Sequence, residues 1–309
     1  MYDLIGDLHG HAAELAALLE ALGYVPAGSG YRHPGGRRVI FLGDYVDRGP
    51  EILRTLRIVR GMVDAGHARA ILGNHEFNAL AFHTPDPDAP GEYLRPHSEK
   101  NIRQHRATLE QLEPRALADA LDWFRTLPLW LDLGGLRAVH ACWDDGHLTC
   151  LGEGLRRLGG ITTDFLREAS ARGTPLFRAV EIILKGKEAA LPAGVLYRDK
   201  DGHARTEVRT RWYLDPAGHT YRTYAFQTEA VENDSVLLED VIAAARPYPS
   251  SAPPVFVGHY WLSAPHPTLL AANVACLDYS VAKGGYLCAY RWDGERALDP
   301  SKLVVAPRA

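Results

Sequence analysis

Three short polar stretches decide the fold: GDLHG at Gly6–Gly10, GDYVDRG at Gly43–Gly49 and GNHE at Gly73–Glu76. Helical patterns follow the first two stretches, and strands that alternate with helices predict a parallel α/β sheet. Polar side chains at the carboxyl ends of parallel strands gather at one edge of the sheet, where sites are built. We therefore expect the three stretches to meet. Each follows an apolar run typical of a buried strand: Tyr2–Ile5, Val39–Leu42 and Ala68–Leu72.

The sequence as a whole predicts one domain, residues 1–309. An insertion at about 142–250 could cover the site. Gly134-Gly135 joins two apolar runs and predicts a β-hairpin, and a further run leads to Gly258-His259. The expected helices are 98–112, 114–127, 163–171 and 177–185. The expected strands are 129–133, 136–140, 255–257, 273–278 and 286–292, with an extended stretch over 195–226 that turns at Asp199–Gly202.

Composition sets the broad class of the protein. The chain has 309 residues, of which 46% are hydrophobic and 23% charged, as in ordinary globular proteins. A net charge of −4 gives no strong signal for nucleic acid or an anionic membrane, although a local basic patch is compatible with it. The longest apolar stretch, Leu269–Leu277, is too short to span a membrane, and no signal peptide is visible. Four cysteines without C-x-x-C spacing favour reduced thiols, so we expect a cytoplasmic protein.

Six polar residues that follow or end the apolar runs form a candidate metal site. Two carboxylates, one amide and three imidazoles suit borderline divalent cations better than Ca²⁺. Six ligands are too many for one catalytic metal with an open position, but they match two metals that share a carboxylate. Two cations ~3.5–4 Å apart can clamp a phosphoryl group and activate water. The six residues are Asp7, His9, Asp44, Asn74, His140 and His259.

The three stretches, in this order, resemble the signature of the calcineurin-like metallophosphoesterases, above all their serine/threonine phosphatase-like (PPP) branch and its bacterial PrpE-like relatives. Val139–Ala141 and Gly258-His259 stand where that family places its last two histidines. The resemblance covers the chain up to His140 and about the last 60 residues, but not the insertion. It implies a four-layer α/β/β/α sandwich of two mixed β-sheets flanked by helices, with the insertion between the last two histidine ligands.

The resemblance also implies how the metal ligands divide. Asp7, His9 and Asp44 would hold one cation. Asp44, Asn74, His140 and His259 would hold the other, so that Asp44 bridges the two. The metal is expected to be Mn²⁺, although Fe²⁺, Zn²⁺, Co²⁺ and Ni²⁺ are compatible with the same ligands.

Three further roles are implied for residues of the second and third stretches. His75 would be the general acid, Asp47 would orient its imidazole, and Arg48 would grip phosphate oxygens as a bidentate fork. The branch carries a second phosphate-binding arginine in the insertion, for which Arg211 beside Trp212 is our candidate. Elsewhere, a group of polar residues could line a substrate groove or simply form the solvated face of a helix: His97, Lys100, His105 and Arg106.

Three functions remain open at this point. The first is hydrolysis of phosphate monoesters, on phosphoserine and phosphothreonine in proteins or on small phosphoesters. The second is a dinucleoside polyphosphate pyrophosphohydrolase, which would use the same metals in a wider, more basic cleft. The third is an inactive phosphate-binding scaffold. Asp47 is usually absent from symmetrical diadenosine tetraphosphate hydrolases, which favours a phosphatase-like or PrpE-like enzyme. Ser263–Pro267 departs from the eukaryotic phosphatases, so we expect no eukaryotic-type regulatory subunits, and the oligomeric state is open.

Overall fold

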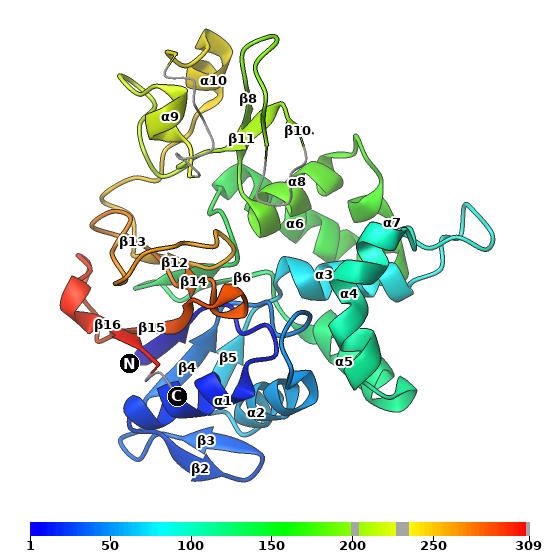
Figure 1. Ribbon diagram of the computed structural model, residues 1–309, viewed down its shortest axis with the longest axis vertical. Coiled ribbons are helices and arrows are strands. Elements are labelled where there is room, and N and C mark those ends of the chain that lie inside the picture. The colour runs from blue at the N-terminus through cyan, green and yellow to red at the C-terminus, as the bar shows by residue number, and fades with distance from the viewer. Residues whose placement is uncertain (199–203, 227–234, 307–309) are drawn as a thin grey trace.

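Two β-sheets packed face to face form the centre of the protein, in a computed structural model that describes residues 1–198, 204–226 and 235–306 (Figure 1). The first sheet has the strand order β14-β15-β1-β4-β5, and β16 pairs with β15. Strands β1, β4 and β5 are parallel, whereas β15 runs antiparallel to β1, β14 and β16, so the sheet is mixed. The bounds are β1 Tyr2–Ile5, β4 Arg38–Phe41, β5 Ala68–Ala70, β14 Asp278–Tyr279, β15 Tyr286–Trp292 and β16 Leu303–Val305.

The second sheet is also mixed and has the order β13-β12-β7-β6. Strand β12 is parallel to β7 and β13, and β6 forms the expected antiparallel hairpin with β7. Its strands are β6 (Trp130–Asp132), β7 (Arg137–Val139), β12 (Val255–Val257) and β13 (Val274–Cys276). The first sheet therefore combines strands from the two ends of the chain, whereas the second combines strands from its middle and its last third.

Alternation along the strands separates the apolar core into two sides. On β4, Ile40 belongs to a cluster that also holds Phe256 of β12, so these side chains fill the space between the sheets. Its neighbours Val39 and Phe41 point the other way, into a cluster shared with the flanking helices. Successive strand residues face opposite sides of a sheet, so one strand serves both layers.

Helices cover the outer faces of both sheets, which confirms the expected order of four layers, α/β/β/α. Helices α1 (Ala12–Ala21) and α2 (Ile52–Asp64) lie below the first sheet in Figure 1 and bury Leu and Ile side chains against it. The remaining long helices pack along the side and over the second sheet: α3 (Asn74–His83), α4 (Glu99–Gln111), α5 (Pro114–Thr126), α6 (Asp145–Leu158), α7 (Thr163–Ser170) and α8 (Pro175–Lys185).

The insertion has two parts. Helices α6–α8 share the main apolar core, whereas the segment after them has a small cluster of its own that includes Leu191, Val208 and Tyr221. This second part projects beyond the sheets at the top of Figure 1. It contains β8 (Glu188–Ala190) paired with β11 (Glu207–Arg209), β9 (Tyr197–Arg198) paired with β10 (Ala204–Arg205), and the short helices α9 (Tyr221–Tyr224) and α10 (Glu239–Ala244). The turn expected at Asp199–Gly202 lies outside the described residues.

Helix α6 is the main element that the sequence pattern did not indicate. Its sequence contains three glycines, which lower helix propensity. Packing against α8 overrides that propensity: a Cβ atom at Gly154 would lie 2.7 Å from Leu176, so the helices approach where a side chain is missing. Asp144 caps the first turn by accepting from the amide of His147, and Gly159 ends the helix in the left-handed conformation. Within the described residues, no helix is long and apolar enough to cross a membrane.

Candidate metal and phosphate site

Asp44 lies at the centre of the site, in the loop after β4. Its Oδ2 is 3.6 Å from His9 Nε2, and its Oδ1 is 3.4 Å from His140 Nε2. Asp44 also belongs to two groups of side chains that could each hold a metal ion. One group is His9, Asp44 and His75; the other is Asp7, Asp44 and His140. Asp44 therefore lies where a carboxylate shared by two cations would have to be.

Asn74, the first residue of α3, brings in the two remaining imidazoles. Its Oδ1 lies 3.0 Å from His140 Nε2 and 2.7 Å from His259 Nδ1. Asp7 lies at the other side of the group and accepts from the amide of His259 at 3.0 Å. The structure thus brings all six expected ligands together from the ends of strands in both sheets.

The loops that carry these residues hold an unusual backbone conformation. Among the described residues, the non-glycine positions with positive φ are His9, Asp44, Asp47, Arg48, His259, Trp261 and Ser280. All but the last belong to the loops of the candidate site. Left-handed backbone is unfavourable for residues with a Cβ atom and persists where the surroundings enforce it, commonly at functional sites.

Two glycines leave space for the carboxylates. A Cβ atom at Gly73 would lie 2.3 Å from Asp44 Oδ1, and one at Gly258 would lie 2.0 Å from Asp7 Oδ1. Any larger residue at either position would push a carboxylate out of the site. Steric contact with these carboxylates therefore explains why glycine stands at Gly73 in GNHE and at Gly258 before His259.

Glu76 braces the loop after β4, a role that the sequence analysis did not assign. Its buried carboxylate accepts from the amides of Asp44 at 2.8 Å, Tyr45 at 2.7 Å and Gly73 at 3.0 Å. Burial, together with the nearby charge of Asp44, raises the pKa of Glu76 to about 7. Glu76 stands three residues after Gly73 in GNHE, which is the spacing of a capping box. The sequence therefore did contain a signal for this role.

The donor atoms fit divalent cations. His9 Nδ1 donates to the carbonyl of Val46, which leaves its Nε2 directed at Asp44. The Nε2 atoms of His9 and His259 are buried and have no hydrogen-bond partner among the described residues. Burial, aided by the charge of His75, lowers the pKa of His9 to about 3, so its imidazole is neutral and has a lone pair to offer.

The pKa shifts of Asp7 and His140 also fit a site for divalent cations. Burial, and then the charge of Asp278, raises the pKa of Asp7 well above its usual range. Burial alone would lower the pKa of His140, but Asp44 outweighs it and raises that pKa to about 10. The site thus holds carboxylates whose charge must be compensated, and a bound cation would compensate it in place of a proton.

His75 and Asp47 form a close pair beside the metal ligands. His75 Nδ1 donates to Asp47 Oδ2 at 2.5 Å, which directs Nε2 toward Asp44 at 3.9 Å. Burial would raise the pKa of Asp47, but hydrogen bonds from His105 and His75 outweigh it and hold that pKa well below its usual range. Asp44 and then Asp47 raise the pKa of His75 against the effect of burial.

Two residues of α4 hold Asp47 from its other side. His105 Nδ1 donates to Asp47 Oδ1 at 2.7 Å, and Thr108 Oγ1 donates to the same oxygen at 2.5 Å. His105 is therefore neither a residue of the groove nor part of a solvated helix face, since it is buried against the His75–Asp47 pair. The structure places Lys100, in contrast, on the wall of the cavity described below.

Arg48 lies over an aromatic ring at the edge of the site. Its guanidinium carbon is 4.3 Å from the centre of the Trp261 ring, and Lys283 Nζ is 4.7 Å from that ring. Trp261 in turn stacks on His9, with 5.4 Å between ring centres. Sequence reasoning missed Trp261, although its place two residues after His259 was a signal.

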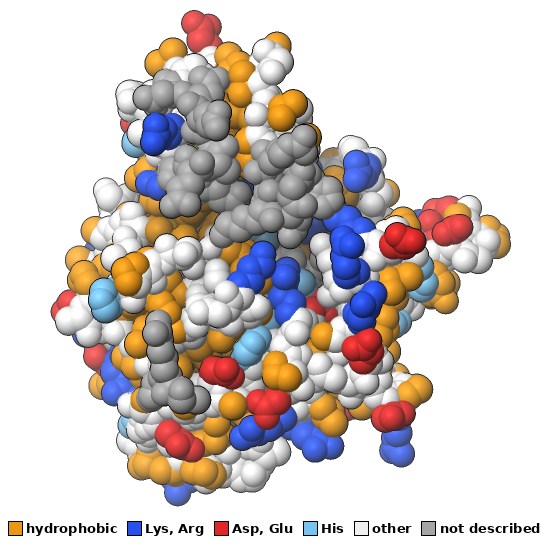
Figure 2. All heavy atoms as spheres, in the orientation of Figure 1, with side chains coloured by type: hydrophobic (Ala, Val, Ile, Leu, Met, Phe, Trp, Pro, Cys, Tyr) orange, Lys and Arg blue, Asp and Glu red, His pale blue; other side chains and the backbone are white. Residues whose placement is uncertain are grey.

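A cavity of about 1700 Å³ opens from this site toward the insertion. Arg48, Asn74, His75 and His259 line it on the side of the sheets, and residues from α6 to β11 line it on the other. Figure 2 shows Lys and Arg side chains gathered around the hollow at the centre of this face. The described lining residues include eleven Lys and Arg and four Asp and Glu, an excess of seven cations in a chain whose net charge is −4.

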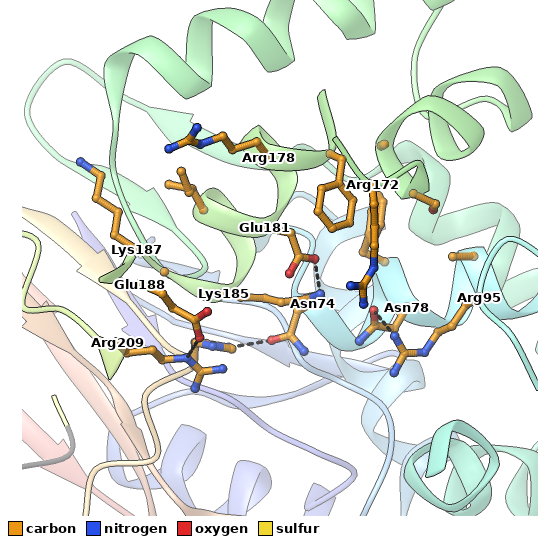
Figure 3. A pocket seen from close by; sticks show the side chains of 18 of the residues that line it. Asn74, Asn78, Arg95, Arg172, Arg178, Glu181, Lys185, Lys187, Glu188 and Arg209 are labelled. Atoms are coloured by element: carbon orange, nitrogen blue, oxygen red, sulfur yellow. Dashed lines mark hydrogen bonds and ion pairs between the residues drawn. The ribbon is translucent and has the colours of Figure 1, made fainter. Parts of the chain in front are cut away.

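The structure does not bring Arg211 to this cavity. Its Nε donates to the carbonyl of Ala225 at 3.1 Å, and Arg211 is not among the described residues that line the walls. Arg209, two residues earlier, lines the cavity and lies beside Glu188 in Figure 3, with 3.8 Å between its Nε and Glu188 Oε1. Strand β11 ends at Arg209, and the chain turns beyond it, where the carbonyl of Arg211 accepts from the amide of Leu214. The two arginines therefore do not share a strand face, although residues two apart within one strand would.

The fold and the site define a class: an α/β sandwich with two overlapping carboxylate–imidazole groups for metals at the ends of its strands, next to a basic cavity. A family model described as calcineurin-like phosphoesterase matches residues 2–233, so the chain belongs to the calcineurin-like phosphoesterase family.

Individual relatives are similar over shorter stretches. The asymmetrical bis(5'-nucleosyl)-tetraphosphatase PrpE of Halalkalibacterium halodurans is 45% identical over 74 residues, 24% of this chain and 30% of that protein. The symmetrical bis(5'-nucleosyl)-tetraphosphatase of Methylococcus capsulatus is 36% identical over 138 residues, 44% of this chain and 41% of that protein. The chain thus matches less than half the length of either relative. Among solved structures, a cold-active protein-tyrosine phosphatase of a psychrophilic Shewanella species has a TM-score of 0.46 and 16% identity, over 99% of this chain and 80% of that chain.

Proposed function

We propose that this chain is a dinuclear-metal phosphohydrolase that cleaves dinucleoside polyphosphates. The observation that carries the proposal is the cavity beside the metal ligands, with its excess of seven cations among the described lining residues. Its volume of about 1700 Å³ exceeds the ~300–1,000 Å³ of most small-molecule pockets. A phosphate monoester needs neither that volume nor that charge, whereas an extended polyphosphate with a nucleoside at each end uses both. The two relatives named as bis(5'-nucleosyl)-tetraphosphatases support the same substrate class.

The ligand assignment follows the sequence expectation. Asp7, His9 and Asp44 would hold one divalent metal, and Asp44 would share the second with Asn74, His140 and His259. When bound, the metals supply charge neutralisation and a water of lowered pKa. Mn²⁺ is the proposed metal, because a mixed set of oxygen and nitrogen ligands suits it.

The residues around the metals have separate tasks in the proposed reaction. Arg48, held over Trp261, grips oxygens of the phosphate that is attacked. His75 acts as the acid in its doubly protonated form: Nδ1 donates to Asp47, and the charges of Asp44 and Asp47 raise the pKa of His75 against burial and so favour a second proton at Nε2. The attacking water loses one proton to the solvent, its oxygen bonds to phosphorus as the bond from phosphorus to the bridging oxygen breaks, and His75 Nε2 gives its proton to the departing bridging oxygen. Arg209 takes the place that the sequence analysis gave to Arg211 as the second phosphate-binding arginine.

The insertion would act as a cap over the site. Residues of α6, α8 and β11 line the cavity opposite the metal ligands, so a bound polyphosphate would lie between the two. Closing a site in this way excludes water and strengthens the electrostatic interactions inside it.

Hydrolysis of phosphate monoesters is the second candidate, and a specific observation favours it. The His75–Asp47 hydrogen bond of 2.5 Å suits protonation of an alkoxide leaving group, which is a poorer leaving group than a nucleotide. The intact pair also argues against an inactive scaffold.

The test incubates the purified chain, loaded with Mn²⁺, with diadenosine tetraphosphate and with a phosphoserine peptide. Nucleotide products from the dinucleotide support the proposal. Inorganic phosphate from the peptide alone would favour the second candidate, and an inert protein that binds two metals would favour the scaffold.

A further inference from the structure

The wall of the cavity beyond His75 carries a second cluster of polar groups. Asn78 follows His75 by three residues on α3, so the two side chains lie on one face of the helix about one turn apart, ~4.5 Å along its axis. Both line the cavity. Asn78 Oδ1 accepts from Arg95 Nη1 at 3.2 Å, which places a guanidinium on the same cavity wall as His75.

Arg95 is a half-buried cation whose hydrogen-bond partners are neutral. Its second partner is Gln104 Oε1, at 2.8 Å from Nη2. Among the described residues, no carboxylate lies within 4.0 Å of its guanidinium. Burial lowers the pKa of Arg95, although the more distant charges of Asp47 and Glu181 oppose this effect. A cation removed from water without a counter-charge is unfavourable, and a bound anion would relieve it.

A second arginine approaches from the opposite wall. Arg172 lies in the segment between α7 and α8, and in Figure 3 its side chain points toward Asn78 and Arg95. The part of the chain that the structure describes gives Arg172 no ion pair with a carboxylate. Two guanidinium groups that face each other across a cavity repel, and an anion between them would turn that repulsion into attraction.

We propose that Arg95 and Arg172, with Asn78 behind them, form a second anion subsite that binds a phosphate of the leaving group. The inference rests on the proposed function, because His75 marks the side from which the leaving group departs. A phosphate that lies about one helical turn from the proton donor belongs to a leaving group that is itself phosphorylated. The subsite therefore selects phosphoanhydrides, in which phosphate is cleaved from another phosphate, over esters of serine, threonine or a simple alcohol.

Competitive inhibition tests the subsite without requiring the natural substrate. Hydrolysis of p-nitrophenyl phosphate is inhibited with orthophosphate, which occupies only the metal site, and with tripolyphosphate, which is long enough to reach the subsite. Free Mn²⁺ is held constant because tripolyphosphate chelates it. The variants are Arg95→Gln and Arg172→Ala, and the control is Arg103→Ala, which removes the same charge from an exposed position on α4.

We expect each variant to raise the Ki of tripolyphosphate about ten-fold or more, as for the loss of one charge-assisted hydrogen bond, and to change the Ki of orthophosphate less than two-fold. The control should change neither constant. An unchanged Ki for tripolyphosphate in both variants, or an equal rise for both inhibitors, would overturn the subsite. Arg172 is exposed, so its variant tests the inference even if Arg95→Gln fails to fold.

The dinucleotide separates this inference from the proposed function. If the wild type fails to cleave diadenosine tetraphosphate but tripolyphosphate inhibition still depends on Arg95 and Arg172, the proposed function is wrong and the subsite stands. If the dinucleotide is cleaved and neither inhibitor responds to the variants, the function stands and the subsite is wrong.

Discussion

Replacing Asp47 by Asn should slow the reaction most for substrates with poor leaving groups. Asp47 Oδ2 accepts from His75 Nδ1 at 2.5 Å, and its charge helps to keep His75 protonated. An asparagine amide keeps the size of the side chain but not the charge, so it cannot stabilise the imidazolium. A charge-assisted hydrogen bond contributes about 1.5–3 kcal/mol, which converts to a roughly ten- to hundred-fold loss of the protonated form.

The assay measures kcat for a series of aryl phosphates whose leaving groups rise in pKa. Proton donation matters more as the leaving group becomes more basic, so the loss should grow along the series, toward the 10²–10⁴-fold typical of general acid catalysis. Metal content and the temperature of unfolding are measured in parallel, because His105 and Thr108 also hydrogen-bond to Asp47. The control is Asp122→Asn, an exposed position on α5.

A uniform loss along the series, with two metals still bound, would refute this reasoning. It would mean that Asp47 acts on the attacking side or on substrate binding rather than through the proton of His75. Loss of metal would instead show that Asp47 is needed to hold the metal ligands in place.

Three other outcomes are expected. His75→Asn should lower turnover by ~10²-fold or more and leave metal content, measured by elemental analysis, near that of the wild type; an emptied site would make His75 a ligand. Asp44→Asn should abolish binding of both metals, and one metal retained at full occupancy would contradict the bridge. Asp144→Asn should lower the free energy of unfolding at pH 7 through the ion pair with Lys187. Hydrogen bonds from His147 and Lys187 outweigh burial and hold the pKa of Asp144 well below its usual range, so its contribution is present above ~pH 4 and is lost as the pH falls. Urea unfolding should therefore separate variant and wild type at pH 7 and less at pH 3, and an equal gap at both would exclude the charge as its cause.

Much of the central fold could be predicted from local pattern. The strand at Tyr2–Ile5 and the last long strand, Tyr286–Trp292, have the expected bounds, because an apolar run between polar neighbours has few alternatives to a buried strand. Helix α6 could not be predicted, since its glycines oppose a helix until α8 packs against them. Local propensity is a weak guide wherever a tertiary contact decides the conformation.

The candidate ligands were predictable because each lies where a strand ends. Asp7, Asp44 and Asn74 follow parallel neighbours β1, β4 and β5, so the order of the strands alone brings them together. The roles of Glu76 and His105 were not predictable in the same way. Both act on the site from a helix, through hydrogen bonds that depend on how that helix packs.

The sequence by itself determined which residues are candidate metal ligands and which turns carry them, because that information is local: a residue type, a glycine and the end of a strand. Only the tertiary structure decided what surrounds them. Arg209 faces the cavity and Arg211 does not because β11 ends between them and the chain turns. The Trp261 ring beneath Arg48 depends on loops more than 200 residues apart. A chain with a net charge of −4 can hold a strongly basic cavity, because net charge is a sum over the chain and folding alone decides where each charge lies.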